Sequence, residues 1–208
     1  MDRWSTQSER LMRAPRGAAY SSDMSRRTLV QTHGLNALTA LLFGLAVWRI
    51  GFSPELPAVL AFIFGGVLLA AIDWKIHRLP TRLVYLTLAG VTGGLLFASL
   101  VEWEWMPRAT AAAGAALFSG AFFTIWFVTQ RLYGFVVLGL GDVRLAAVLG
   151  ALLGWYGLEY VLYGALAGHL LAVVIGVAVA LSRRTFRMTY AFGPSLIAGT
   201  LAVVLVHV

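Results

Sequence analysis

The stretch Gly139-Leu140-Gly141-Asp142-Val143-Arg144 places a carboxylate in a glycine-rich turn directly before a long apolar run, residues 143–158. An acidic side chain at the edge of a membrane helix is energetically costly, so it marks a functional site by default and should have a partner. Asp73 is the candidate partner, because it ends another apolar run, residues 56–72. An aspartic hydrolase embedded in a bilayer requires two acids, each at the end of a membrane segment.

The composition places the chain among integral membrane proteins. Hydrophobic residues make up 60% of its 208 residues and charged residues 12%, whereas about a quarter of residues are charged in soluble domains. The absence of cysteine excludes disulfides and thiolate metal sites. A net charge of +7 would suggest nucleic acid as the partner of a soluble protein, but here the basic residues flank apolar segments. We therefore expect the lipid bilayer as a partner, and no nucleic acid.

Seven apolar runs predict an all-α, polytopic transmembrane helical bundle of about seven helices (six to eight), since each run is close to the ~17–25 residues that cross a bilayer. Their ranges are 35–51, 56–72, 83–101, 110–129, 143–158, 161–181 and 190–207. Residues 1–34 are polar, rich in Arg and without an apolar period, which is typical of a disordered basic tail. The predicted organisation is a cytoplasmic tail, 1–34, followed by a transmembrane domain, 35–208.

The distribution of basic residues predicts a cytoplasmic N-terminus, because Lys and Arg in short loops stay on that side of the membrane. The inner segments are then 1–34, 73–82, 130–144 and 182–189. Of the 16 Lys and Arg residues, only Arg49 and Arg108 lie outside these segments. In this orientation Asp73 and Asp142 reach the same membrane face. A single miscounted loop would place them about 30 Å apart, where shared chemistry is impossible.

Two neighbouring carboxylates can hydrolyse a peptide bond, because an ionised acid can take a proton from water while a protonated acid donates one to the leaving amine. In a poorly solvated site both cannot ionise easily, so one apparent pKa rises. Gly139 and Gly141 fit this interpretation, since glycine permits irregular backbone and close approach. The helix ends favour Asp142 as the resting carboxylate and Asp73 as the proton holder. No residues have metal-ligand spacing, so we expect no metal or other cofactor.

Three motifs in order resemble the prepilin peptidase family, the membrane aspartic proteases that process type IV pilin-like precursors. They are Asp73 followed by Leu79-Pro80 and Arg82-Leu83, then Gly139-x-Gly141-Asp142-Val143-Arg144-Leu145, then Phe192-Gly193-Pro194. The resemblance covers roughly residues 55–208.

The resemblance implies that Asp73 and Asp142 are the catalytic aspartates of a peptidase domain, with Gly139, Gly141, Pro80 and Arg144 as supporting residues. It implies a prepilin or pseudopilin precursor as substrate, cut after a short basic leader at the cytoplasmic face of the inner (plasma) membrane, in type IV pilus assembly or protein secretion. Larger members have a cytoplasmic cysteine-rich region associated with N-methylation, which this sequence lacks. We therefore expect cleavage and leave methylation and the oligomeric state open.

Three other interpretations remain. The acids could be solvated interfacial groups that pair with Lys75 and Arg144. The chain could be another GxGD-type intramembrane protease that acts on signal-peptide remnants, but such enzymes pair GxGD with Tyr-Asp, whereas Ile72 precedes Asp73 here. A proton-coupled transporter or channel would use the acids as a relay and predicts inverted repeats and acids near mid-membrane. We find no repeat, and both acids lie at helix ends, which favours the peptidase.

Overall fold

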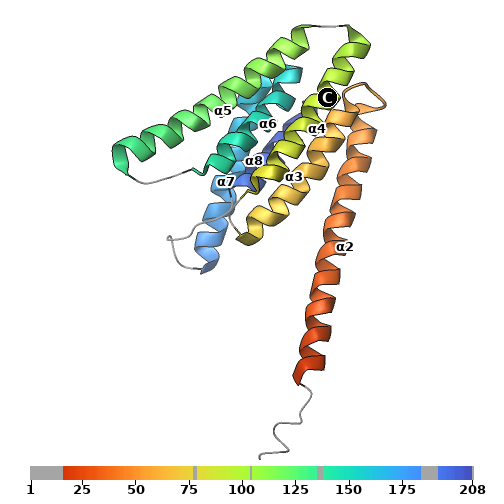
Figure 1. The fold of residues 1–208 in the computed structure, drawn as a ribbon, viewed down its shortest axis with the longest axis vertical. Coiled ribbons are helices and arrows are strands. Elements are labelled where there is room, and N and C mark those ends of the chain that lie inside the picture. The colour runs from red at the N-terminus through yellow and green to blue at the C-terminus, as the bar shows by residue number, and fades with distance from the viewer. Residues whose placement is uncertain (1–15, 77–78, 104, 135–137, 184–191, 208) are drawn as a thin grey trace, which may run out of the picture. The chain divides into compact units, whose positions relative to one another are not determined.

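The computed structural model describes residues 16–76, 79–103, 105–134, 138–183 and 192–207. The chain forms two compact units, Met1–Leu38 and Thr39–Val208. Seven α-helices occupy the described residues (Figure 1): α2 (Arg16–Ile50), α3 (Leu56–Ile76), α4 (Thr81–Glu102), α5 (Met106–Tyr133), α6 (Leu140–Tyr156), α7 (Leu158–Arg183) and α8 (Gly193–His207). The predicted all-α class is confirmed.

Six of the seven helices begin and end within a few residues of the apolar runs that predict them. Helix α2 differs, because it begins at Arg16, inside the polar segment 1–34 that was expected to be a disordered tail. Ala, Arg, Leu and Gln in this segment are good helix formers, so a helical backbone forms there without an apolar face. Residues 1–15 of the predicted tail lie outside the described residues.

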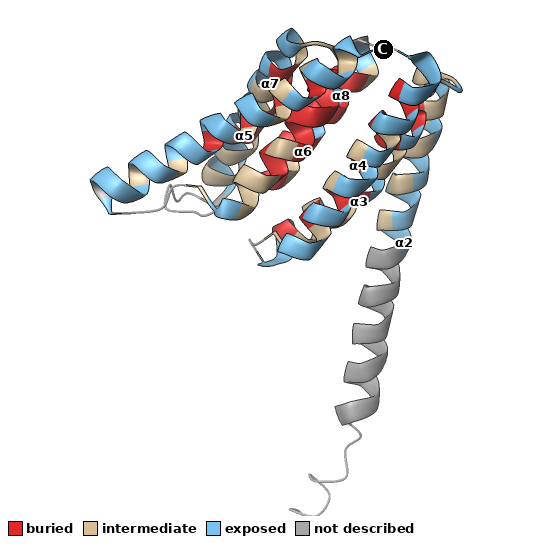
Figure 2. Ribbon diagram, turned by 45° about the horizontal axis from the view of Figure 1, so that its top comes forward, coloured by how far each residue is buried: buried red, intermediate tan, exposed pale blue. Residues whose placement is uncertain are grey.

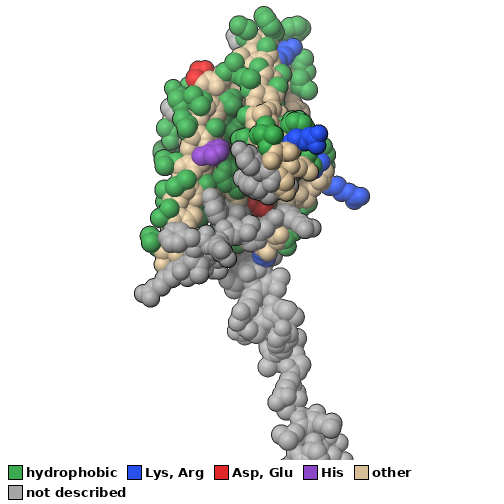
Figure 3. Space-filling model, turned by 90° about the vertical axis from the view of Figure 1, so that its left-hand side faces the viewer, with side chains coloured by type: hydrophobic (Ala, Val, Ile, Leu, Met, Phe, Trp, Pro, Cys, Tyr) green, Lys and Arg blue, Asp and Glu red, His purple; other side chains and the backbone are tan. Residues whose placement is uncertain are grey.

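Within the described ranges, five helices are long and apolar enough to cross a membrane: His33–Ile50, Leu56–Ile76, Thr81–Glu102, Met106–Leu132 and Leu158–Ser182. Large hydrophobic side chains remain exposed on them, and hydrophobic side chains cover much of the described surface in Figure 3. The chain is therefore a multi-pass membrane protein. Helices α6, with 17 residues, and α8, with 15, are about 25 and 22 Å long, which is shorter than the ~30 Å hydrocarbon core.

Helix α6 lies at the centre of the second unit. Helix α5 packs along one side of it and α4 along another, while α3 packs on α4 and α8, and α7 packs on α8 (Figure 1). Buried residues are concentrated on α6, α3 and α8 (Figure 2). Leu145, Leu149 and Leu152 of α6 are completely inaccessible. A helix whose middle is shielded in this way by its neighbours need not span the hydrocarbon core by itself.

Glycines bring α5 and α6 into backbone contact. A Cβ atom at Gly150 would clash with the carbonyl of Gly114, and one at Gly154 would clash with the carbonyl of Thr110. Small residues at helix crossings drive close packing in membranes, where there is no hydrophobic effect between helices. The α5–α6 pair is therefore a rigid support for the start of α6, where Asp142 lies.

Candidate active site

Helix α3 carries Asp73 in its last turn, where the carboxylate is almost completely buried. Asp73 is 5% exposed, whereas the next three residues, Trp74, Lys75 and Ile76, are exposed. The backbone N–H of Gly193 donates a hydrogen bond of 3.2 Å to Oδ2 of Asp73. Because Gly193 begins α8, Asp73 lies at the end of its own helix and also at the N-terminal end of α8. The positive end of the α8 dipole stabilises negative charge at that point.

Helix α6 carries Asp142 in its first turn. Oδ2 of Asp142 accepts a hydrogen bond of 3.1 Å from the backbone N–H of Gly139, and the N–H of Asp142 donates to the Gly139 carbonyl over 3.0 Å. Gly139 is the N-cap residue and has no side chain to make the reciprocal bond of a full capping box. The carboxylate is therefore held against its own helix start by one backbone donor.

The two glycines of this turn act differently. Gly139 has φ −74° and ψ 150°, an extended conformation that any residue can adopt, so its backbone does not require glycine. A Cβ atom at Gly139 would lie 3.5 Å from Oδ2 of Asp142, which is ordinary contact. At Gly141 it would lie 3.0 Å from Cβ of Leu79. Gly141 therefore lets the first turn of α6 lie close against the residue before Pro80.

The N-terminus of α4 forms a third side of the site. Pro80 is its N-cap residue, with φ −65° and ψ 116°, and its carbonyl accepts hydrogen bonds from the N–H groups of the first turn. Nη1 of Arg144 donates to Oγ1 of Thr81 over 3.0 Å, and the Arg144 guanidinium lies 5.9 Å from the ring centroid of Tyr85. Arg144 thus connects the start of α6 to the start of α4.

The two acids influence each other electrostatically. Burial raises the pKa of Asp142 to about 6, the hydrogen bond from Gly139 opposes this rise, and the negative charge of Asp73 adds to it. The Asp142 carboxyl group lies in the first turn of α6, before the apolar run 143–158. The end of α3 and the start of α6 are therefore close enough for the two carboxyl groups to interact electrostatically.

The contact with α8 bears on the division of roles expected from helix ends, which made Asp73 the proton holder. The N-terminus of α8 beside Asp73 favours negative charge on this acid, whereas burial makes a charge costly at both acids. The division of roles therefore stays a prediction. Among the described residues, no group of three or more His, Cys, Asp or Glu side chains is placed to hold a metal ion.

A comparison with known protein families matches residues 59–181 to the type IV leader peptidase family. The chain belongs to the type IV leader peptidase family. The matched range runs from α3 to the end of α7 and includes both acids, Pro80, the glycine turn and Arg144. It ends before α8.

Curated relatives of this chain include proteins named "Prepilin leader peptidase/N-methyltransferase". The protein from Dickeya chrysanthemi is 37% identical over 174 residues, which cover 82% of this chain and 57% of the relative. The protein from Xanthomonas campestris pv. campestris is 32% identical over 161 residues, which cover 76% of this chain and 53% of the relative. The chain thus spans about half the length of these relatives. No solved structure matches it.

The sequence motifs did not reveal that Gly193 is a direct partner of Asp73. The last of the three motifs, Phe192-Gly193-Pro194, lies at the start of α8. The signal that could have found the contact is the set of N–H groups that every helix N-terminus leaves without an intrahelical partner. Sequence spacing alone does not show which helix start lies beside which acid.

Proposed function

We propose that this chain is a membrane aspartic endopeptidase that removes the short basic leader from type IV prepilin or pseudopilin precursors. The observation that carries the proposal is that Asp73 is buried beside the N–H of Gly193 and Asp142 lies in the first turn of α6, close enough that the charge of Asp73 adds to the pKa rise that burial causes at Asp142. Two coupled carboxylates can provide acid and base catalysis as one pair. The family match and the names of the relatives support the substrate class.

The proposed reaction is the attack of water on the scissile carbonyl. Asp73, whose Oδ2 accepts the N–H of Gly193, is the carboxylate that takes a proton from the attacking water as its oxygen bonds to the carbonyl carbon. Asp142, with a pKa of about 6, donates a proton to the amide nitrogen as the C–N bond breaks. The products are a free leader carboxylate and a new N-terminal amine. Because the two acids are coupled, the apparent pKa values belong to the pair.

The proposal places the site at the cytoplasmic face of the inner membrane. The basic residues in the segments 73–82 and 130–144, on either side of the two acids in the sequence, support this orientation. A precursor whose apolar helix stays in the bilayer would then present its leader junction at the level of the helix ends that carry Asp73 and Asp142. The leader itself would remain in the cytoplasm.

The test is a cleavage assay on a gel with the full chain in membranes or detergent and a precursor that has a basic leader, a Gly and an apolar helix. Wild-type protein is expected to cut after the Gly, and Asp73→Asn and Asp142→Asn proteins are expected to leave the precursor intact. Glu102→Gln is the matched control, because Glu102 is an exposed acid at the end of α4, and it should cut normally. Normal cleavage by either aspartate variant would contradict the proposal.

The same assay separates the peptidase from a proton relay. An Asp→Glu substitution keeps a titratable acid and would preserve a relay, but it moves the carboxylate by one methylene, which a hydrolytic pair tolerates poorly because reacting groups must be positioned closely. Asp142→Glu protein that cuts at the wild-type rate would argue against direct catalysis. The proposal covers cleavage alone, and the mass of the product's N-terminal peptide reports methylation separately.

A further inference from the structure

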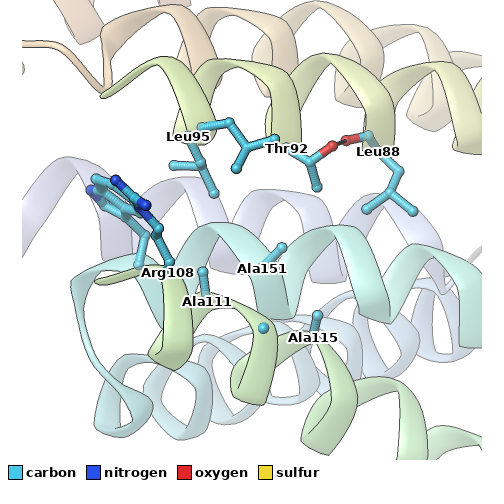
Figure 4. A pocket seen from close by; sticks show the side chains of 10 residues that line it. Leu88, Thr92, Leu95, Arg108, Ala111, Ala115 and Ala151 are labelled. Carbon is cyan, nitrogen blue, oxygen red and sulfur yellow. Dashed lines mark hydrogen bonds between the residues drawn. The ribbon is translucent and has the colours of Figure 1, made fainter. Parts of the chain in front are cut away.

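A groove in the membrane-spanning part of the second unit has no role in the proposed reaction. It is a cavity of about 280 Å³ between α4 and α5, with part of α6 at its base. Leu88 and Leu95 of α4 form one wall, Ala111 and Ala115 of α5 face them, and Arg108 stands at one end (Figure 4).

The groove exists because α5 packs closely on α6 but only loosely on α4. The glycine contacts hold the α5 backbone against α6, and the short alanine side chains then leave the space toward α4 unfilled. The hydroxyl of Thr92, which also lines the groove, donates to the Leu88 carbonyl over 2.7 Å. Its hydrogen bond is satisfied within its own helix, so the lining suits a hydrocarbon chain and offers little to water.

Arg108 gives the end of the groove a positive charge. Its Nη2 donates to the carbonyl of Ser99 over 2.6 Å, and a guanidinium has five N–H donors in a planar fork. Arg49 is the other arginine expected on the same side of the membrane, and its Nε and Nη2 bind the carbonyls of Leu205 and Val206 at the end of α8. Both guanidiniums thus bind backbone carbonyls, but of the two arginines Arg108 is the one that lines the apolar groove.

The neighbours of Arg108 mark the headgroup level of the bilayer. Trp103 is 87% exposed and Trp105 is 68% exposed, and both lie where α4 ends and α5 begins. Exposed tryptophans of membrane proteins favour the interface between headgroups and hydrocarbon. A guanidinium at this depth is at the level of lipid phosphates, which it can bind in bidentate fashion.

The lining of the groove indicates the chemistry of its occupant. Apolar side chains of α4 and α5 line a groove of about 280 Å³, and a guanidinium stands at one end (Figure 4). This arrangement matches a phospholipid, which joins an apolar chain to a charged headgroup. We propose that the groove binds an anionic phospholipid, with one acyl chain between α4 and α5 and the headgroup phosphate on Arg108.

A lipid at this place would hold α4 against the α5–α6 pair. The groove lies toward the C-terminal end of α4, while the contact of Thr81 with Arg144 lies at its N-terminal end. The proposed lipid therefore does not contact the two acids. Its binding can be measured separately from cleavage, and it is independent of the proposed function.

Native mass spectrometry of the delipidated full chain tests this proposal, with phosphatidylglycerol and phosphatidylcholine of identical acyl chains added in equal amounts. Wild type is expected to retain more phosphatidylglycerol. Arg108→Gln should lower the phosphatidylglycerol-to-phosphatidylcholine ratio about fivefold, the effect of removing one basic residue near anionic lipid. Arg131→Gln is the matched control, because Arg131 is an exposed arginine at the other end of α5 that does not line the groove, and it should lower the ratio less than Arg108→Gln does.

A second variant tests the groove itself. Ala112 lines the cavity from the exposed side of α5, so Ala112→Leu should narrow the groove without disturbing the α5–α6 contact and should lower retention of both lipids. Equal retention of both lipids by wild type, an equal effect of Arg131→Gln, or unchanged retention by Ala112→Leu would overturn the proposal. Displacement of the lipid by a peptide of the precursor's apolar helix would instead assign the groove to substrate. The melting temperature of each variant verifies that it is folded.

Discussion

The backbone N–H of Gly193 and Oδ2 of Asp73 form a buried hydrogen bond of 3.2 Å between residues 120 positions apart. It joins the start of α8 to the end of α3 and makes the last helix part of the candidate site, although the family match ends at residue 181. A Cβ atom at position 193 would lie 2.8 Å from the same Oδ2 atom and 3.7 Å from Cδ2 of Leu145. The carboxylate thus occupies the space that any side chain at this position would need.

Gly193→Ala is therefore expected to displace the Asp73 carboxylate and to lower the cleavage rate by about 10- to 100-fold, because small displacements of a catalytic group have large effects on rate. The rate is measured in the cleavage assay, with melting temperature as the test of folding. Gly93→Ala is the matched control, because a Cβ atom at Gly93 has open space around it. A folded Gly193→Ala protein that cuts at the wild-type rate would show that this contact does not position Asp73.

The fold was largely predictable from the sequence, because membrane helices leave long apolar runs. The runs 56–72 and 83–101 predict α3 and α4 to within a few residues at each end. The start of α2 at Arg16 was not predictable in this way, since a polar helix has no apolar period. The short length of α6 follows from its burial among neighbouring helices, which sequence periodicity alone does not reveal.

The candidate site was predictable in its residues but not in its contacts. The expectation of two acids at helix ends on one membrane face was enough to select Asp73 and Asp142 as candidates. The partners of these acids come from packing: α8 lies beside α3, and this brings the Gly193 N–H to Asp73. The roles of the two acids depend on such neighbours as well as on each acid's own helix, so their assignment stays a prediction.

Asp142→Asn is expected to stabilise the protein at neutral pH. The pKa of Asp142 is raised to about 6 in the folded protein, above the value of about 3.9 for an unfolded aspartate. Folding therefore takes up a proton between about pH 4 and 6, so the stability of the folded state falls as pH rises through this window. Asparagine still offers an oxygen to the Gly139 N–H but carries no charge, so it should gain about 1–3 kcal/mol at pH 7.5.

The measurement is the melting temperature in detergent at pH 4 and at pH 7.5. Asp142→Asn should melt higher than wild type at pH 7.5, and the difference should shrink toward zero at pH 4. Glu159→Gln is the control, because Glu159 is an exposed acid in the first turn of α7. A difference of the same size at both pH values would mean that ionisation of Asp142 is not its cause.

Arg144 and Thr81 are expected to act as a unit. The 3.0 Å bond between them connects the starts of α6 and α4, so removing either partner should loosen the turn that presents Asp142. Arg144→Gln and Thr81→Val should each lower kcat/KM by a few fold, and the double variant should be little worse than either. A coupling of about 0.5–1.5 kcal/mol is expected for one hydrogen bond. Additive losses in the double-mutant cycle would show that Arg144 acts elsewhere.

Gly150→Ala is expected to destabilise the bundle more than any exposed glycine substitution. Its Cβ atom would clash with the Gly114 carbonyl and approach Cα of Ala115 at 3.0 Å, and because these are backbone atoms the helices must separate. Overpacking of this kind costs about 1–3 kcal/mol, which should lower the melting temperature by several degrees. Gly120→Ala on α5 is the control, since a Cβ atom there has nothing within 4 Å, and it should be neutral or slightly stabilising. Because α6 carries Asp142 at its start, the Gly150→Ala protein should also lose cleavage activity below its melting temperature. If the Gly150→Ala protein has the melting temperature of wild type and cuts normally, α5 and α6 are not in backbone contact. The packing that holds Asp142 in position must then come from α4 instead.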